Sequence, residues 1–350
     1  MWISEIEIQN IRSLKSLKTN FSNKLNIILG LNGAGKTSIL EAIHLLSLGK
    51  SFRKGSEINI INSTENFFRI KGLINDKEKK IKIQNSRNKI EKKIKINNNV
   101  LKSKSDLIGI FPTVIFSPDT LDIVSGGTTA RLSFFNRIFC TVDKEYTYDL
   151  IELRKIIIQK KHLLKNKDKN QIDYWNDIFA EKSHKIWKKR YKLWSDFSKE
   201  FDKLWKTIYP EKEAKIEYGD YVDVDVFEIK EKLNKIKDQE FYTGRLGFGP
   251  QKDEFTFYYN KKLLKEFGSQ GEKKFFHYVL KLVEGNFIKI KTGKTPVLLL
   301  DDLFAKIDSN RIEKMLSKML EKFQMFITST DIHKDGVSSW ITKETKLINL

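Results

Sequence analysis

The stretch GLNGAGKTS, Gly30–Ser38, decides the fold of this chain because it matches the phosphate-binding loop, G-x-x-x-x-G-K-[ST], at every fixed position. Gly33 and Gly35 let the backbone turn so that successive N–H groups point at phosphate oxygens. Lys36 supplies a positive charge for the β- and γ-phosphates, and Thr37 supplies a hydroxyl for Mg²⁺. We therefore expect a site for ATP and Mg²⁺ formed by Gly30, Leu31, Asn32, Gly33, Ala34, Gly35, Lys36, Thr37 and Ser38.

The segments that flank the loop have the order that such a loop requires. LNIIL, Leu25–Leu29, is a short apolar run ending in glycine, which predicts a buried strand that feeds the loop. After the loop, the apolar residues Ile39, Ala42, Ile43 and Leu46 recur at helical spacing. A strand, a glycine-rich loop and a helix in this order favour a nucleotide site over a chance match. The helix would also present its positive end to the phosphates.

A second, acidic half of the site is predicted near the C-terminal end. PVLLLDD, Pro296–Asp302, is the most apolar strand in the sequence and ends in two carboxylates. An acidic residue at the end of a buried strand beside the phosphate loop organises Mg²⁺. We assign this role to Asp301, with Thr37 as the other Mg²⁺ ligand, and expect Asp302 to orient or deprotonate the attacking water. Lys36, Asp301 and Asp302 are thus the candidate catalytic residues, and an acidic pair on a solvated turn is the alternative.

The middle of the chain has a different amino-acid composition from its two ends. From Tyr146 to Tyr209 there is neither glycine nor proline, and aromatic residues recur every three or four positions among lysines. This pattern predicts a long amphipathic helix packed against a second helix at about residues 147–165. We expect the stripe to form the helix–helix core, with a base-stacking platform as the alternative. Its members are Trp187, Tyr191, Trp194, Phe197, Ser198, Phe201, Trp205 and Ile208.

Buried strands alternate with helices at both ends of the chain. FQMFITST, Phe323–Thr330, adds another apolar strand after PVLLLDD. This arrangement indicates an α/β protein whose parallel sheet is completed from both ends, with a helical insertion. We expect an ATPase lobe made of residues 1–140, with the phosphate loop and a β-rich subdomain, and of residues 241–350, with the remaining ATPase motifs. Residues 141–240 would form the inserted helical lobe.

The charge of the chain points to a polyanionic partner. Lys and Arg number 65 against 45 Asp and Glu, a formal net charge of +20. Such a field favours nucleic acid, although the Lys, Asn and Ile content also fits the compositional bias of an AT-rich genome. Between Phe67 and Ile96, Lys and Ile alternate along predicted strands, so that one sheet face is apolar and the other carries lysines. That lysine face is either simply solvated or faces DNA.

The sequence gives no sign of export. Cys140 is the single cysteine, which excludes an intrachain disulfide and fits a reducing cytoplasm. There is no apolar run of about eighteen residues, the length of a membrane span, so no membrane partner is expected. The first residues, MWISEIEIQN, have the alternation of a strand rather than the pattern of a signal peptide. We expect a cytoplasmic protein.

FGSQGEKK, Phe267–Lys274, precedes the PVLLLDD strand and is similar to the signature motif of ATP-binding-cassette ATPases. In that class a serine and a glycine open a helix that faces the nucleotide of a second subunit. The resemblance implies that Ser269, Gly271 and Glu272 reach the γ-phosphate held by a partner, so that ATP joins a head-to-head homodimer. Asp308 fits the D-loop that crosses the same interface.

These motifs, with further blocks, resemble the RecF family of bacterial recombination mediators, of the SMC and Rad50 class, over essentially the whole chain. The resemblance implies an ATP-gated dimeric clamp on duplex DNA at single-strand gaps, which helps to load recombinase with RecO and RecR. It also implies slow, DNA-stimulated ATP hydrolysis that resets the clamp. The blocks are GLNGAGKTSILEAIHLLSLGKSFR (Gly30–Arg53), IFSPDTLDIVSGGTTARLSFFN (Ile115–Asn136), GPQKDEF (Gly249–Phe255), SQGEKK (Ser269–Lys274) and LLLDDLFAKID (Leu298–Asp308).

The chain departs from the family pattern in two blocks. Thr128 stands in place of a proline, Leu132 in place of a second arginine, and Phe135 with Asn136 in place of Leu-Asp. Gln251 and Lys252 replace His-Arg. No catalytic role is therefore carried over to these positions, and none is assigned to Arg53.

Two other functional classes share part of this pattern. A transporter-type ATPase subunit would have the same nucleotide motifs, but the switch histidine common in such cassettes is absent from FITST. In this chain we expect Thr328, Ser329 or Thr330 to sense the γ-phosphate in place of that histidine. His333, which lies nearby in the sequence, is expected to be solvated. The other alternative is a non-enzymatic scaffold that ATP only stabilises.

Overall fold

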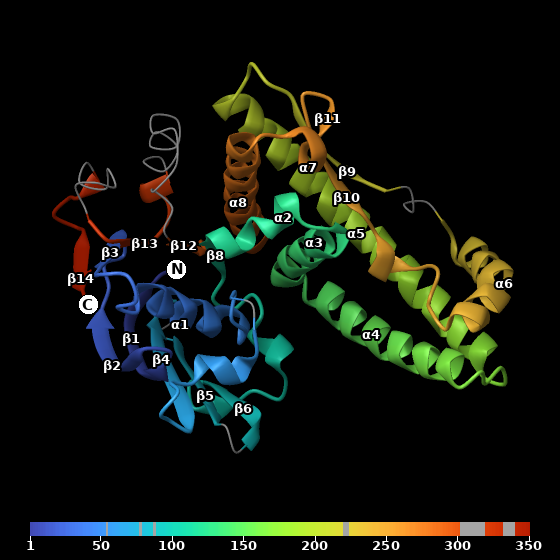
Figure 1. The fold of residues 1–350 in the computed structure, drawn as a ribbon, viewed down its shortest axis with the longest axis horizontal. Helices are drawn as coiled ribbons and strands as arrows, with labels where there is room; N and C mark the ends of the chain where they lie inside the picture. Colours follow the sequence, from blue (N-terminus) through green and yellow to red (C-terminus); the bar gives the residue numbers. More distant parts are fainter. Residues whose placement is uncertain (54, 77–78, 87–88, 220–223, 302–318, 332–339) are drawn as a thin grey trace. The chain divides into compact units, whose positions relative to one another are not determined.

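The chain folds as two compact units (Figure 1). Unit 1 comprises Met1–Asp122 with Gln270–Leu350, and unit 2 comprises Ile123–Ser269. A computed structural model describes residues 1–53, 55–76, 79–86, 89–219, 224–301, 319–331 and 340–350. Unit 1 is built from both ends of the sequence, and unit 2 is inserted between them.

A five-stranded parallel sheet holds the nucleotide motifs of unit 1, in the order β14-β3-β13-β12-β8. All four neighbouring pairs are parallel, and β8, β12 and β13 are buried along their whole length. The predicted parallel sheet completed from both ends of the chain is thereby confirmed. Its strands are β3 (Leu25–Leu29), β8 (Thr113–Phe116), β12 (Val297–Leu300), β13 (Met325–Ser329) and β14 (Lys346–Asn349).

The second sheet of unit 1 is antiparallel, in the order β2-β1-β4-β5-β6-β7. Ile70, Ile83 and Ile94 pair across three of its strands and are buried. Because successive side chains of a strand point to opposite faces, the lysines that alternate with these isoleucines face outward. The strands are β1 (Ile3–Ile11), β2 (Leu14–Asn20), β4 (Phe67–Ile74), β5 (Lys79–Ser86), β6 (Lys89–Ile96) and β7 (Asn99–Val100).

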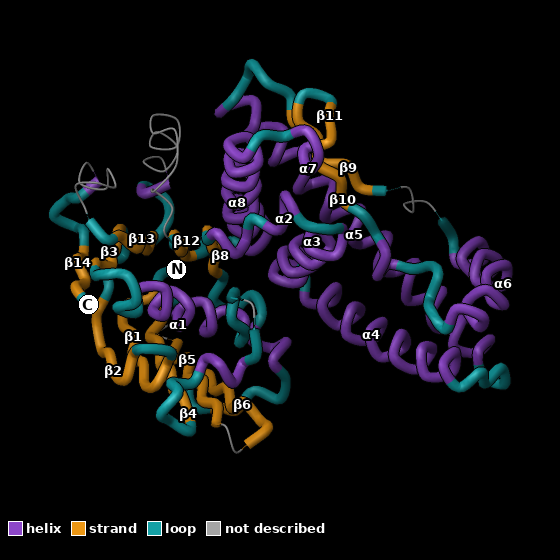
Figure 2. Tube along the Cα trace, viewed as in Figure 1, coloured by secondary structure: helices purple, strands orange, loops and turns teal. Residues whose placement is uncertain are grey.

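Helix α1 (Lys36–Leu48) contacts strands of both sheets (Figure 2). Its residues from Ser38 to Ser47 are all buried, as expected of a helix inside a core. The packing is close at Gly72 of β4, where a Cβ would lie 2.4 Å from the Leu46 side chain. Helix α8 (Gln270–Thr292) packs on β8. The described residues of unit 1 also form three short 3-10 helices: η1 (Glu57–Ile60), η2 (Lys104–Leu107) and η3 (Pro118–Thr120).

Unit 2 consists of helices and a small antiparallel sheet in the order β11-β10-β9. On its long helix α5, Trp187, Phe197, Phe201 and Trp205 are buried, which confirms the core prediction for these four members of the aromatic stripe. Tyr191 is instead exposed, and the other members, Trp194, Ser198 and Ile208, are half-buried. The elements are α2 (Asp122–Ser125), which begins at the unit boundary, α3 (Thr128–Val142), α4 (Lys144–Lys165), α5 (Ile172–Ile208), β9 (Ala214–Tyr218), α6 (Val226–Thr243), η4 (Pro250–Lys252), β10 (Phe255–Tyr259), β11 (Lys262–Leu263) and α7 (Leu264–Phe267).

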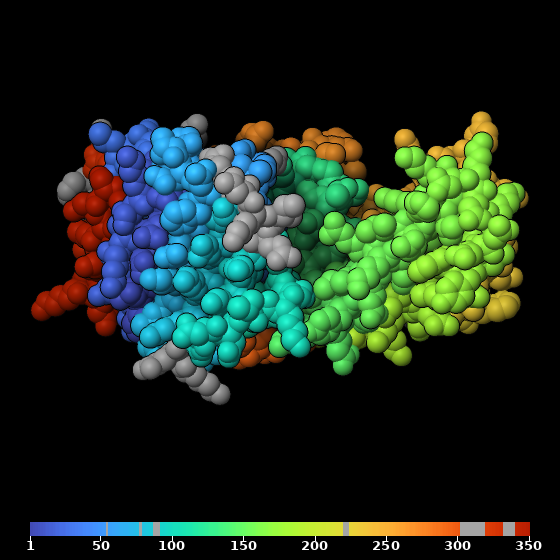
Figure 3. Space-filling model, turned by 90° about the horizontal axis from the view of Figure 1, so that it is seen from below, coloured from blue at the N-terminus to red at the C-terminus, as the bar shows by residue number. Residues whose placement is uncertain are grey.

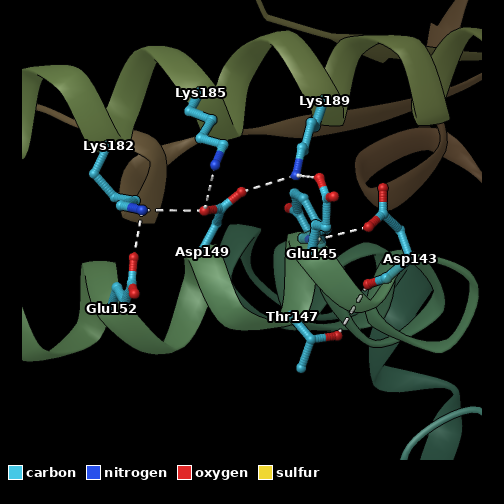
Figure 4. A network of polar contacts seen from close by, with 9 residues as sticks. Asp143, Glu145, Thr147, Asp149, Glu152, Lys182, Lys185 and Lys189 are labelled. Atoms are coloured by element: carbon cyan, nitrogen blue, oxygen red, sulfur yellow. Dashed lines mark hydrogen bonds and ion pairs between the residues drawn. The ribbon is translucent and has the colours of Figure 1, made fainter.

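An ionic network joins α4 to α5 (Figure 4). Asp149 of α4 is buried and lies 3.1 Å from the Nζ of Lys182, 3.5 Å from that of Lys185 and 3.0 Å from that of Lys189. Two glutamates of α4 also take part, since Glu152 binds Lys182 and Glu145 binds Lys189. Hydrogen bonds from Lys189 and Lys182 lower the pKa of the Asp149 carboxyl, although burial alone would raise it. These lysines are therefore paired with acids rather than presented to a partner.

The boundaries of unit 2 lie outside the range 141–240 expected for the helical lobe. The unit also includes α3 and β10, because their aromatic side chains enter the core of α5. Phe135 of α3 stacks on Phe255 of β10 with ring centroids 3.9 Å apart, and it meets Phe197 of α5 edge-on at 5.3 Å. The change of composition near Cys140 marks the start of the long helices, and the compact unit starts earlier.

Candidate nucleotide-binding site

The phosphate loop joins β3 to α1 and has the backbone conformation that its glycines permit. Gly33 and Gly35 have φ angles of +85° and +107°. At Gly35 a Cβ would also lie 2.8 Å from the Leu14 side chain, so a larger residue would be strained and would displace Leu14. The loop tip, Leu31–Gly33, is exposed, whereas Ser38 is buried in the first turn of α1. The exposed backbone at the positive end of α1 is suited to bind an anion.

The side chain of Lys36 lies along the loop. Its Nζ donates hydrogen bonds to the carbonyl oxygens of Gly30, at 2.7 Å, and Leu31, at 3.0 Å. An ammonium group has three N–H donors, so these two bonds leave donor capacity for a phosphate oxygen. The ammonium group of Lys36 is therefore held against the backbone of the phosphate loop.

Thr37 and Asp301 come from opposite ends of the sequence and meet in unit 1. The Oγ1 of Thr37 donates to the Oδ1 of Asp301 at 2.9 Å. Asp301 directly follows β12, and its backbone N–H donates to the carbonyl of Phe116, which continues the β12–β8 ladder by one residue. Asp301 as a residue is 8% exposed, so it is nearly enclosed. A third side chain, Thr328 of β13, donates from its Oγ1 to the same oxygen at 3.0 Å.

This group of oxygens fits Mg²⁺. A hydroxyl and a carboxylate oxygen within hydrogen-bond distance are the hard donors that Mg²⁺ takes, together with phosphate oxygens and water. The hydroxyl of Thr37 gives its one proton to Asp301, which leaves its lone pairs for other partners. The sequence expectation placed both residues at one ion, and the geometry brings these two side chains together.

Of the other residues singled out in the sequence, some are described by the structure and some are not. Asp302 and Asp308 fall outside the described residues, as does His333. Ser269 directly precedes α8 and is exposed, Gly271 is exposed in its first turn, and Glu272 is half-buried. A Cβ at Gly271 would meet nothing within 4 Å, so its surroundings are open. Arg53 is exposed, and its backbone N–H donates to the Ser51 hydroxyl at 2.9 Å.

One set of contacts near the loop was not expected from the sequence. Arg12 binds the fully buried Glu41 of α1 through two hydrogen bonds of 3.0 and 2.9 Å. Ser51 donates to the same carboxylate at 2.5 Å. These bonds attach the turn between β1 and β2, and the segment after α1, to the helix that follows the phosphate loop. A glutamate within the apolar pattern of α1 was the available signal, because a buried carboxylate needs a partner.

Comparison with known proteins finds relatives that match nearly the whole chain. The sequence profile described as RecF/RecN/SMC N terminal domain matches residues 2–335. The DNA replication and repair protein RecF of Bacillus cereus (strain AH820) is 31% identical over 365 aligned residues, which cover 100% of this chain and 97% of the relative. The chain belongs to the RecF family. RecF of Bacillus thuringiensis (strain Al Hakam) is similar to the same extent.

Solved structures agree with membership of the RecF family. A structure of the recombination mediator protein RecF with ATP, described as part of the RecFOR pathway, has a TM-score of 0.88 at 32% identity and covers 95% of this chain and 94% of its own. A second RecF structure, described as RecF-ATPrS, has a TM-score of 0.87 at 30% identity, covering 100% and 96%. The Smc head domain of Pyrococcus furiosus matches at 0.55 and 15% identity, over 96% and 91%, which shows a common fold. The fold is therefore that of an ABC-type ATPase head with an inserted helical lobe.

No helix among the described residues combines the length and the apolar composition that crossing a bilayer requires.

Proposed function

We propose that this protein is an ATP-dependent DNA-binding protein of DNA replication and repair, in which ATP closes a homodimer on duplex DNA and hydrolysis releases it. The observation that carries the proposal is the contact between Thr37 and Asp301, which joins the two halves of a nucleotide site encoded 264 positions apart. The name and pathway of the RecF relatives support the role in repair. RecO and RecR, which the pathway name includes, are the proposed protein partners at single-strand gaps.

In the proposed site each residue has a separate task. The backbone of Gly30–Ser38 and the Lys36 ammonium bind the phosphates, while Thr37 and Asp301 hold Mg²⁺. The ion would neutralise charge that develops on the phosphates. Asp302 is proposed to orient the attacking water. Because each hydrolysis ends a DNA-bound state, slow and DNA-stimulated turnover is expected of such a switch.

The proposed dimer uses the start of α8. Ser269 and Gly271 are exposed there, and the first N–H groups of a helix have no intrahelical partner. This end of α8 can therefore bind the γ-phosphate of a second subunit. Asp308 is proposed to cross the same interface.

The proposed DNA surface is the outward side of β4–β6, called here the lysine face. Lys71, Lys82 and Lys95 pair directly across the three strands, with Arg69 and Lys93 in the neighbouring row. Figure 3 views a side of the molecule on which these strands, light blue to cyan, reach the surface.

Repulsion between these cations supports a polyanionic ligand. Partial burial, and then the charges of Arg69, Lys71 and Lys95, lower the pKa of Lys82. Like charges directly opposite each other destabilise a sheet. Glu7 of β1 pairs with Lys71 at 2.7 Å, whereas Lys82 and Lys95 form no ion pair with a described side chain. The lysines between α4 and α5, by contrast, are paired with acids (Figure 4).

The test is binding to gapped duplex, plain duplex and single-stranded DNA at several salt concentrations, with ATP, with ADP and without nucleotide, while light scattering reports mass. We expect ATP to double the mass and to tighten duplex binding, with a steep loss of affinity as salt rises. Lys36→Ala, which removes the phosphate-binding ammonium, should abolish both responses. If ATP changes neither mass nor DNA affinity in the unaltered protein, the clamp proposal fails. Fractionation with membranes would instead favour a transporter subunit.

A further inference from the structure

Thr328 and Thr37 contact the same atom of the same carboxylate. Both hydroxyls donate to the Oδ1 of Asp301, at 3.0 Å from Thr328 and 2.9 Å from Thr37. Thr328 is 3% exposed and Asp301 is 8% exposed, so water does not readily replace the bond between them. The shared oxygen is therefore held by one side chain from the phosphate loop and by another from a different strand.

The strand order explains why Thr328 is in this place. β13 lies between β3, which feeds the phosphate loop, and β12, which is directly followed by Asp301. Ile327 of β13 pairs with Leu300 of β12, so the next residues, Thr328 and Asp301, are neighbours beyond the end of the ladder. Thr328 also pairs with Ile28 of β3. The central position of β13 thus places the Thr328 hydroxyl where the phosphate loop and Asp301 meet.

The neighbouring hydroxyls have different surroundings. The Oγ of Ser329 accepts a hydrogen bond from the backbone N–H of Asp331 at 3.1 Å, which shapes the turn after β13. Thr330 is exposed. Among the three hydroxyls that the FITST segment offers, it is therefore the hydroxyl of Thr328 that binds the acidic residue of the nucleotide site.

We propose that Thr328 is a positioning residue that sets the orientation of the Asp301 carboxylate for Mg²⁺, an inference that rests on the proposed function. A carboxylate rotates easily about its last torsion, because that torsion has broad, two-fold minima. Two donors on Oδ1 restrict this rotation and fix the direction of the other carboxylate oxygen. Thr328 acts through Asp301, so its removal should affect the use of the metal and leave the contacts of the loop backbone with phosphate in place.

The experiment compares Thr328→Val with Thr328→Ser in the full chain. Valine has nearly the shape of threonine without the hydroxyl, and serine restores the hydroxyl alone. Binding of a fluorescent ATP analogue is titrated without divalent cation and then at increasing Mg²⁺, and the Mg²⁺ concentration for half-maximal tightening is measured. We expect Thr328→Val to raise that concentration about 10-fold, the scale of one hydrogen bond to a charged group. The affinity for nucleotide without metal should change by much less than 10-fold, and the thermal midpoint without Mg²⁺ should stay close to that of the unaltered protein.

The outcomes separate this inference from the proposed function. If the unaltered protein binds the analogue equally with and without Mg²⁺, the proposed metal-dependent site is wrong. If the unaltered protein needs Mg²⁺ and Thr328→Val needs no more of it, the positioning role is wrong and the site remains. If Thr328→Ser is as impaired as Thr328→Val, the hydroxyl is not the cause, and the inference fails as well.

Discussion

At the scale of single residues, His277 of α8 has an environment that predicts a dependence of stability on pH. The side chain is fully buried, and its Nε2 lies 3.1 Å from the hydroxyl of Thr120. Burial, and then the positive charge of Lys281, lowers the pKa of His277 to about 3, although Glu284 opposes this. Lys281 and Glu284 are themselves buried and paired at 2.8 Å. The folded protein therefore keeps His277 neutral where an exposed histidine is charged.

The sign follows from the proton balance. Below about pH 6.5 the unfolded chain binds a proton on this histidine that the folded state does not, so the free energy of unfolding falls as pH decreases towards 3. One group contributes up to about 1.4 kcal/mol per pH unit, or about 2 kcal/mol between pH 6.5 and 5.0. Urea unfolding at these two values should show this loss in the unaltered protein. His277→Gln, which keeps a neutral hydrogen-bonding group, should lose about 2 kcal/mol less, and an equal loss in both proteins would disprove the assignment.

At the scale of elements, a buried ion pair joins the parts of unit 2. Arg190 of α5 binds Asp253, which follows η4, and donates to the Tyr146 hydroxyl of α4 at 2.8 Å. The same guanidinium donates to the side chain of Asn136 in α3 at 3.2 Å. Asn136 places a neutral amide beside this guanidinium, and among the described residues Asp253 is the carboxylate that binds Arg190.

Removing one partner of this pair should be costly. Arg190→Met leaves Asp253 buried without its cation, and such an uncompensated charge costs about 3–5 kcal/mol. The measurement is the urea midpoint followed by circular dichroism. Lys188→Met is the matched control, because this neighbouring side chain is exposed and a surface change stays within about 0.5 kcal/mol. Similar midpoints for the two variants would mean that the buried pair contributes no net stability.

The lysine face is a second feature that belongs to elements rather than to single residues. Lys82→Glu with Lys95→Glu reverses two neighbouring charges on β5 and β6. We expect weaker duplex binding with ATP and a shallower salt dependence, by about 0.9 in the logarithmic slope for each phosphate that the protein no longer neutralises. The control is Lys232→Glu with Lys235→Glu, which makes the same change in net charge on the exposed side of α6. Equal reductions in affinity for the two double variants would assign the effect to net charge and exclude a local DNA site.

At the scale of the whole molecule, the sequence predicted the parts with strong local signals. The run LNIIL is β3 to the residue, and the buried strands expected in Pro296–Asp302 and Phe323–Thr330 are the shorter β12 (Val297–Leu300) and β13 (Met325–Ser329). Strand order was not predictable, because nothing local states that β13 lies between β3 and β12. The contact of Thr328 with Asp301 depends on that order, which is why the sequence suggested three hydroxyls for one role.

The extent of unit 2 was hidden for a related reason. The composition of the sequence changes where the long helices begin, whereas the extent of the compact unit depends on which aromatic residues share a core. Phe135 and Phe255 lie far apart in sequence and stack within unit 2. Long-range packing of this kind leaves no periodic signal in either segment, so composition alone placed the boundaries too close to the helices.

The last prediction concerns assembly and separates binding of ATP from its use as a link between subunits. Ser269→Arg places a long cation at the exposed start of α8, where it should block a second subunit by its bulk. Lys36→Ala should instead weaken nucleotide binding itself, because it removes an ammonium from the phosphate loop. We expect Ser269→Arg to bind ATP with near-normal affinity as a monomer and to lose the ATP-dependent gain in mass and in duplex affinity together. A Ser269→Arg protein that still doubles its mass with ATP would show that the dimer forms through another surface, and the link between α8 and the partner's nucleotide would have to be abandoned.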